Sequence, residues 1–150
     1  MGKSPKIYFM MFPQIRCFHS NVNEQPFMFY VLCKGDNAGK PGVKPWLNSF
    51  SVLCNNQEAF DFYFWLVYGL YQAGKFKPRL RGSVIPFVDL DDVKDVVKDV
   101  TPCILPNWLQ YQKVLKALDL LEQSKTTLGQ QLLTTQNLQQ FLIRKFFDRL

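Results

Sequence analysis

The sequence predicts an α+β protein, with a small mixed β-sheet domain that holds a buried aromatic helix and is followed by a long, coiled-coil-like C-terminal helix. Three observations lead to this class. Short aromatic and β-branched runs, separated by turn-forming residues, occupy the first half. A nearly continuous apolar run at 58–73 is typical of a buried helix. The last third has no proline after Pro106, a single glycine at Gly129, and many good helix formers. We therefore expect a globular domain at 1–105 and a helix within 106–150.

Three short segments are expected to form the sheet. Segments 7–12 and 27–33 are aromatic or β-branched and have turn formers between them. The glycine-rich, charged segment 33–42 is expected to be a loop. The strand pattern resumes at 46–53.

The aromatic helix has recognisable ends. Asn55 is the expected N-cap, because Glu58 follows three residues later as in a capping box. Gly74 is expected to end the helix as a left-handed cap.

The segment after this helix carries four cations at alternate positions. An extended backbone at 75–81 would place them on one face, with Phe76 and Leu80 on the other. Same-face neighbours on a strand are about 6.6 Å apart, a spacing comparable to that of successive phosphates. A charged edge strand that discourages aggregation is an equally good interpretation. With the lysines of the 33–42 loop, the expected DNA-binding residues are Lys34, Asn37, Lys40, Lys44, Lys75, Lys77, Arg79 and Arg81.

The chain between this segment and the last helix is expected to hold two further short elements. Asp89 is the expected cap of a short helix over 90–97, with acidic residues in its first turn. A strand at 100–105 is expected to follow, and Pro106 suits the first turn of the last helix.

The last helix has an apolar stripe with alternating spacings of three and four residues. A helix over 108–148 would be roughly 60 Å long, whereas a compact domain of about a hundred residues has a radius near 13 Å. A second copy is therefore expected to cover the stripe, although polar Lys125, Thr135 and Gln139 interrupt it. The alternative is a break near Gly129 that folds the chain back as an αα-hairpin. The expected dimer-interface residues are Val114, Leu118, Leu121, Leu128, Leu132, Leu142 and Phe146.

The composition argues against catalysis and against a metal site. The chain has one histidine, His19, and four cysteines without a C-x-x-C pair, so no nucleophile and base or zinc-ligand set can be assembled from spacing. We expect no enzyme activity, no cofactor and no metal, and reduced, buried thiols in a cytoplasmic protein. The longest apolar run, 62–68, is too short to span a membrane. The net charge of +6 permits an anionic partner, nucleic acid first.

The order of these motifs points to a family. The loop Lys-Gly-Asp-Asn-Ala-Gly-Lys at 34–40 is followed by the aromatic helix, an Arg-Gly-Ser turn at 81–83, and Leu105-Pro106 with Gln110 at the start of the last helix. Over roughly residues 30–150 this order resembles the target recognition domain and spacer helix of type I restriction–modification specificity subunits.

This resemblance implies a DNA-binding recognition module without catalysis. In that family, methylation and cleavage belong to other subunits, and each chain carries two recognition domains and two spacer helices. This chain resembles half of such a subunit, so the implied assembly is a homodimer on a bipartite site in double-stranded DNA. Methyltransferase and restriction subunits are the further implied partners. The alternative is a protein–protein adaptor that keeps the scaffold without binding DNA.

Overall fold

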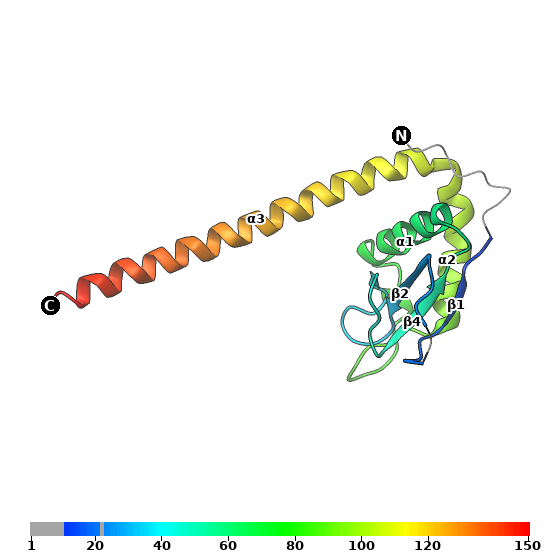
Figure 1. The fold of residues 1–150 in the computed structure, drawn as a ribbon, viewed down its shortest axis with the longest axis horizontal. Coiled ribbons are helices and arrows are strands. Elements are labelled where there is room, and N and C mark those ends of the chain that lie inside the picture. The colour runs from blue at the N-terminus through cyan, green and yellow to red at the C-terminus, as the bar shows by residue number, and fades with distance from the viewer. Residues whose placement is uncertain (1–10, 22) are drawn as a thin grey trace. The chain divides into compact units, whose positions relative to one another are not determined.

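The computed structural model describes residues 11–21 and 23–150, and it confirms the α+β class (Figure 1). The chain divides into two units, Met1–Tyr111 and Gln112–Leu150. The division falls later than the expected boundary at residue 105, because the first turn of the last helix packs within the first unit. Each unit is described by itself below.

The first unit contains a four-stranded sheet in the order β1-β4-β2-β3. The strands are β1 Gln14–Cys17, β2 Met28–Leu32, β3 Pro41–Gly42 and β4 Ser49–Leu53. All three pairings are antiparallel, so the expected mixed sheet is wrong. The physical reason is the connectivity, since no helix lies between the strands to make the crossover that a parallel pair needs.

Two of the expected strands are found. Segments 27–33 and 46–53 contain β2 and β4. Residues 7–10 of the expected strand 7–12 lie outside the described residues, and residues 11–12 precede β1 without belonging to a strand.

The register of the sheet separates a core face from an outer face. Ile15, Val52 and Phe29 form one row across β1, β4 and β2, and all three are buried. These side chains belong to one apolar cluster with the buried residues of two helices. The outer face begins with the neighbouring row Gln14, Leu53 and Met28.

Helix α1, Gln57–Gln72, covers part of the core face and buries Phe62, Leu66 and Val67. The rings of Phe60 and Phe64 both meet Phe29 of β2 edge-on. These contacts explain why α1 is apolar on most of its surface.

Both ends of α1 have side-chain or backbone caps. The N-cap is Asn56 rather than the expected Asn55, and its Oδ1 accepts a hydrogen bond of 2.8 Å from the Ala59 N–H. At the other end Gly74 has φ 68°, as expected for a left-handed cap. The Gly74 and Lys75 N–H groups donate to Tyr71 O and Leu70 O, which satisfies two terminal carbonyls.

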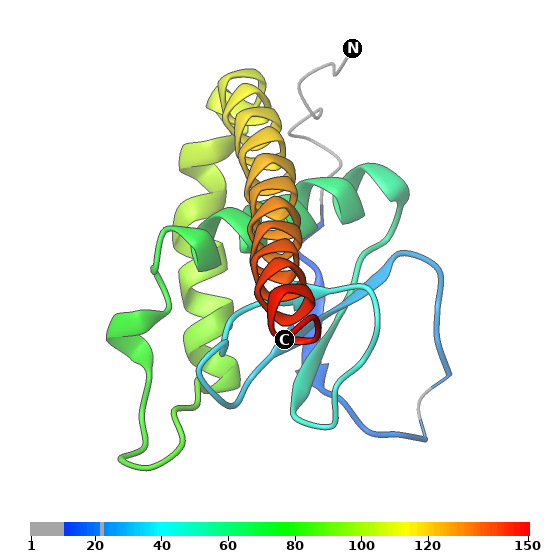
Figure 2. The ribbon, with the colours of Figure 1, turned by 90° about the vertical axis from the view of Figure 1, so that its left-hand side faces the viewer.

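Helix α2, Leu90–Ile104, is longer than expected and runs in a different direction from α1 (Figure 2). The strand expected at 100–105 is wrong, because residues 100–104 belong to α2 and residue 105 begins the 3₁₀ helix η3, Leu105–Asn107. Val93, Val97, Val100 and Ile104 repeat with helical spacing and pack into the core, which outweighs the β-branched composition and the proline inside the helix. Asp89 is the N-cap residue, but its side chain makes no capping hydrogen bond.

The segment 75–81 is not extended, so the expected arrangement of its four cations along one strand face is wrong. It contains the short 3₁₀ helix η2, Lys77–Arg79, with a proline in its first turn. The Lys77 and Arg79 N–H groups donate to Gly74 O and Phe76 O. Phe76 is 2% exposed and lies so close to Gly39 that a Cβ there would collide with the ring.

Helix α3, Trp108–Phe147, is a single helix of 40 residues. The preceding Pro106 lies in the 3₁₀ helix η3, Leu105–Asn107. Trp108 is buried with its ring 4.8 Å from that of Phe62, and the Tyr111 hydroxyl donates to Trp65 O at 2.7 Å. The helix continues through Gly129, so the alternative of an αα-hairpin is wrong.

Replacement of Asn56 by Ala should lower the free energy of unfolding by about 1 kcal/mol, because the Ala59 N–H loses its capping acceptor. Chemical denaturation measures this change. Asn55→Ala is the matched control and should have a much smaller effect. A larger loss for Asn55→Ala would contradict the assignment of the cap.

Candidate functional site

The most extensive candidate surface is the apolar stripe of α3. The second unit consists of this helix and the last three residues, so no other element of the unit covers it. The exposed fractions of Leu121, Leu128, Leu132, Leu142 and Phe146 lie between 58% and 64%. Val114 is 47% exposed and Leu118 is partly buried. All seven expected interface residues thus lie on one uninterrupted helix.

Polar residues occupy three positions of the same stripe. Lys125, Thr135 and Gln139 fall on the seven-residue repeat, and all three are exposed. Two exposed apolar side chains, Leu138 and Ile143, flank the stripe near its C-terminal end and widen it there. The stripe is therefore most apolar at its two ends and more polar between them, a pattern that restricts how a second helix can align with it.

A second candidate surface lies where the glycine-rich loop packs against the end of α1. The Tyr71 hydroxyl donates to Asn37 Oδ1 at 2.8 Å, and Gly39 lies against Phe76. Phe87 pairs with both Lys34 and Arg81 through isolated bridges. The loop and the segment after α1 therefore lie side by side (Figure 2), although they are distant in the sequence. We call the exposed lysines of these two segments the lysine cluster; they are Lys34, Lys40, Lys75 and Lys77.

Two of the expected DNA-binding cations are already paired with acidic groups. Arg79 Nη1 lies 3.0 Å from Asp92 Oδ1, and Arg81 contacts both Asp92 and Asp89 at 3.2 and 2.8 Å. The Asp92 side chain is 12% exposed, so these ion pairs are partly shielded from solvent. Arg79 and Arg81 therefore hold the 75–89 segment against the start of α2 and offer little free charge to a ligand.

The lysine cluster differs from the arginines in this respect. Within the described part of the chain, none of its four side chains is in an ion pair. Lys44 is also exposed but lies in the loop after β3, and the Asn37 side-chain oxygen is occupied by Tyr71. The structure thus brings together four of the eight expected residues as free cations, from two separate segments. Such a group can contact phosphates.

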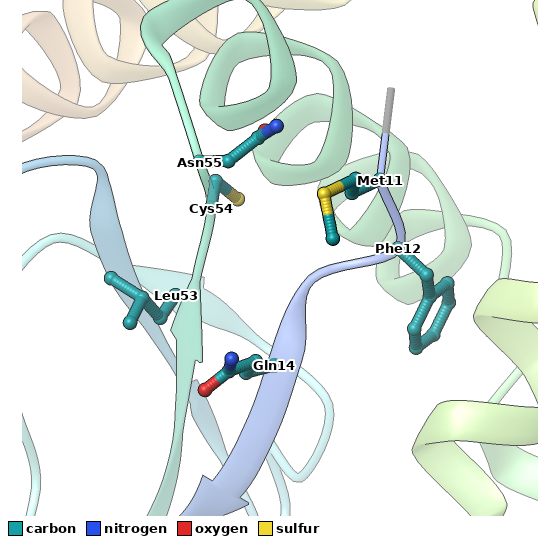
Figure 3. A pocket seen from close by; sticks show the side chains of 6 residues that line it. All are labelled: Met11, Phe12, Gln14, Leu53, Cys54 and Asn55. Carbon is teal, nitrogen blue, oxygen red and sulfur yellow. The ribbon is translucent and has the colours of Figure 1, made fainter. Parts of the chain in front are cut away.

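The hollow shown in Figure 3 does not add catalytic groups. It has a volume of 160 Å³ and lies between β1, β4 and the residues that precede β1. Met11 and Cys54 face each other across it, and its lining contains no charged side chain (Figure 3). Burial raises the pKa of Cys54 to about 12, so this thiol stays protonated at neutral pH. Among the described residues, no group of three or more His, Cys, Asp or Glu side chains is arranged to hold a metal ion.

The cysteines are only partly as expected. All four are free thiols, but Cys17 and Cys103 are exposed, so the expectation that every thiol is buried is wrong. Cys103 lies on the solvent side of α2, and Cys17 lies on an edge strand. Burial occurs where a neighbouring element covers the side chain, which apolar sequence neighbours alone do not reveal.

The sequence analysis missed a third surface, on the outer face of the sheet. Arg16, His19 and Gln25 line a hollow of 320 Å³ there. The alternation in Gln14-Ile15-Arg16-Cys17 was the available signal, since it is typical of a strand buried on one face only. The run at 7–12 is more apolar and is the stronger strand signal, which hides the polar face of β1 in the sequence.

Together these features define a small α+β domain that continues into a long helix with an uncovered apolar stripe. The profile of the family of unknown function DUF6943 matches residues 15–145, and the chain belongs to this family. No curated protein and no solved structure matches the chain. Among the described residues, no helix combines the length and the apolar character needed to cross a membrane.

Alkylation with iodoacetamide at neutral pH should distinguish the cysteines by their burial. Cys17 and Cys103 should be modified rapidly, whereas Cys54 should react only at the rate of global unfolding, because its raised pKa and its burial leave almost no accessible thiolate. Mass spectrometry of peptides at successive times measures these rates, and denaturant should make Cys54 react. Modification of Cys54 as fast as Cys103 in the folded protein would contradict its placement.

Proposed function

We propose that this protein is a non-catalytic, homodimeric interaction module in which α3 pairs with α3 of a second copy. The observation that carries this proposal is the exposed apolar stripe of α3 on a unit that contains no other helix. Burial of a Leu or Phe side chain is worth about 1.5–3 kcal/mol, so the stripe offers a substantial driving force for association. A long helix of alternating three- and four-residue spacing is typical of helices that pair along their length.

The sequence of the stripe favours an antiparallel pair. In a parallel pair in register, Lys125 would face Lys125 of the second copy, and like charges in a seam oppose pairing. A parallel pair would also gather Arg144, Lys145 and Arg149 of both copies at one end. An antiparallel pair places these charges of the two copies at opposite ends.

A particular antiparallel register matches the layers by polarity. If Val114 lies opposite Phe146 of the second copy, Leu118 lies opposite Leu142. The same register places Lys125 opposite Thr135, so the most polar layers coincide. Leu128 then meets Leu132 at the centre, and Leu121 opposite Gln139 is the one layer that mixes apolar and polar side chains.

DNA recognition is the second candidate function, and the lysine cluster is the observation that favours it. Its four exposed lysines come from two segments that pack together, and lysines of this kind are suited to contacts with a phosphate backbone. An antiparallel dimer would carry one such cluster at each end and would suit a bipartite site in double-stranded DNA. In that role, methyltransferase and restriction subunits would be the further partners. Without DNA binding, the same dimer would serve as a protein–protein adaptor.

The cytoplasm is the proposed location of either assembly. The four cysteines are unpaired, which suits a reducing compartment.

The dimer is tested by light scattering of the full chain and of the variant Leu128→Glu with Leu132→Glu. The wild type should be a dimer at micromolar concentration. The variant should be a monomer, because each helix would bring two charged side chains into the apolar centre of the interface. Gln130→Glu with Asn137→Glu is the matched control, since it places the same charges on the face of α3 opposite the stripe. A wild-type monomer would overturn the proposal.

The same experiment can report the orientation. A spin label at Lys116→Cys, in a chain with Cys17, Cys33 and Cys103 replaced by Ser, should give a distance of about 42 Å between copies in the proposed register. A parallel pair would instead give roughly 20 Å, because helix axes lie about 8–10 Å apart.

DNA binding is tested by titration of a generic duplex at several salt concentrations. The logarithm of affinity should fall with the logarithm of salt by about 0.9 for each neutralised phosphate. Lys40→Glu with Lys77→Glu should weaken binding at least about tenfold and flatten this dependence, because it reverses two charges of the lysine cluster. The matched control, Lys98→Glu with Lys116→Glu, makes the same charge change elsewhere and should retain most of the affinity. No measurable salt dependence would remove this candidate and leave the adaptor.

A further inference from the structure

The outer face of the sheet carries a hollow that the proposed dimer and DNA functions do not use. Two rows of side chains form its floor, as the strand register shows. Gln14, Leu53 and Met28 make one row, and Arg16 and Ser51 begin the next. Directly opposite side chains on one face of an antiparallel pair lie about 4.5–5.5 Å apart, so these groups are immediate neighbours.

The loop between β1 and β2 supplies the wall of this hollow. His19 and Gln25 line it from that loop, and the hollow has a volume of 320 Å³, within the range of small-molecule sites. In the described part of the first unit, α1 and α2 lie on the other side of the sheet, because their buried residues belong to the cluster on the core face. The floor and wall therefore remain accessible from solvent.

The polar groups of the hollow are suited to an anion. Arg16 is exposed and is in no ion pair within the described residues, so its guanidinium donors are free. A guanidinium matches a carboxylate with two parallel hydrogen bonds. The His19 imidazole and the amides of Gln14 and Gln25 add donors, and no acidic side chain lines the hollow.

An acidic residue of the same loop, Glu24, bears on where an anion can bind in the hollow. Burial raises the pKa of Tyr30, in the second row, and the negative charge of the Glu24 carboxylate raises it further. Glu24 makes no ion pair with Arg16. The anionic group of a ligand would therefore lie at Arg16, and the rest of the ligand would extend over the first row.

Met28 and Leu53 give that first row an apolar surface, because both are partly buried and lie side by side. Inorganic phosphate would leave this surface exposed, whereas an organic anion would cover it. We propose that the hollow between β1, β4, β2 and the loop residues His19 and Gln25 binds a small organic carboxylate, with the carboxylate on Arg16 and an apolar body on Met28 and Leu53.

The test uses sodium benzoate as the probe and ¹⁵N–¹H correlation spectra of the full chain as the measurement. Benzoate should shift the signals of Arg16, Met28, Ser51 and Leu53 in a saturable way. Benzamide has the same ring without the charge, and phosphate has the charge without the ring. Both should bind at least about tenfold more weakly than benzoate, because each lacks one of the two contacts.

Arg16→Gln should weaken benzoate binding at least about tenfold, since it removes the guanidinium. Arg149→Gln is the matched control; it removes an exposed arginine from the second unit and should leave the affinity unchanged. The spectra themselves show whether each variant is folded. Equal binding of benzoate and benzamide, equal binding of phosphate, an unchanged affinity in Arg16→Gln, or no saturable shift would each overturn the proposal.

Discussion

The exposed apolar side chains of α3 are the main physical constraint on this protein, because their contact with water is unfavourable. A helix of 40 residues exposes its apolar stripe over most of its length, and the second unit has nothing with which to cover it. Helix propensity favours the conformation but does not remove Leu and Phe side chains from water. The first turn shows what burial contributes, since Trp108 and Tyr111 pack against α1 through a ring contact and a hydrogen bond. Beyond this turn, the second unit contains no other helix or strand that makes equivalent contacts.

The globular unit is organised around one face of its sheet. Phe29 joins the sheet to α1 through Phe60 and Phe64, and the valines of α2 complete the same cluster. Because both helices serve this face, the other face is free to carry polar side chains at regular positions. The division follows from the period of two along each strand, which sends alternate residues to opposite sides. The core and the outer hollow are therefore two consequences of one register.

Electrostatics decide which cations of the globular unit are available. Arg79 and Arg81 share Asp92, and these contacts hold the 75–89 segment in place. Among the residues that the structure describes, the lysines on the neighbouring loop form no such ion pair, and their side chains are exposed. The net charge of this surface therefore does not show how many cations are available to a ligand. Each positive side chain counts equally, whether it is held in an ion pair or is exposed to solvent. Which role a residue takes depends on whether an acidic side chain from another element reaches it.

The sequence by itself determined the elements whose signals are local. The length of α3 followed from its spacing and composition, and the end of α1 at Gly74 followed from the conformational freedom of glycine. Only the tertiary structure decided the rest. The alternation in 75–81 favoured a strand, but Phe76 is drawn into the core beside Gly39 and the backbone turns. The β-branched composition at 100–105 favoured a strand. Residues 100–104 form the end of α2 instead, because Val93, Val97, Val100 and Ile104 have helical spacing and pack in the core. The lysine cluster and the outer hollow each combine residues from segments that are distant in the sequence. Their proximity depends on tertiary packing contacts, which the order of residues along the chain does not show.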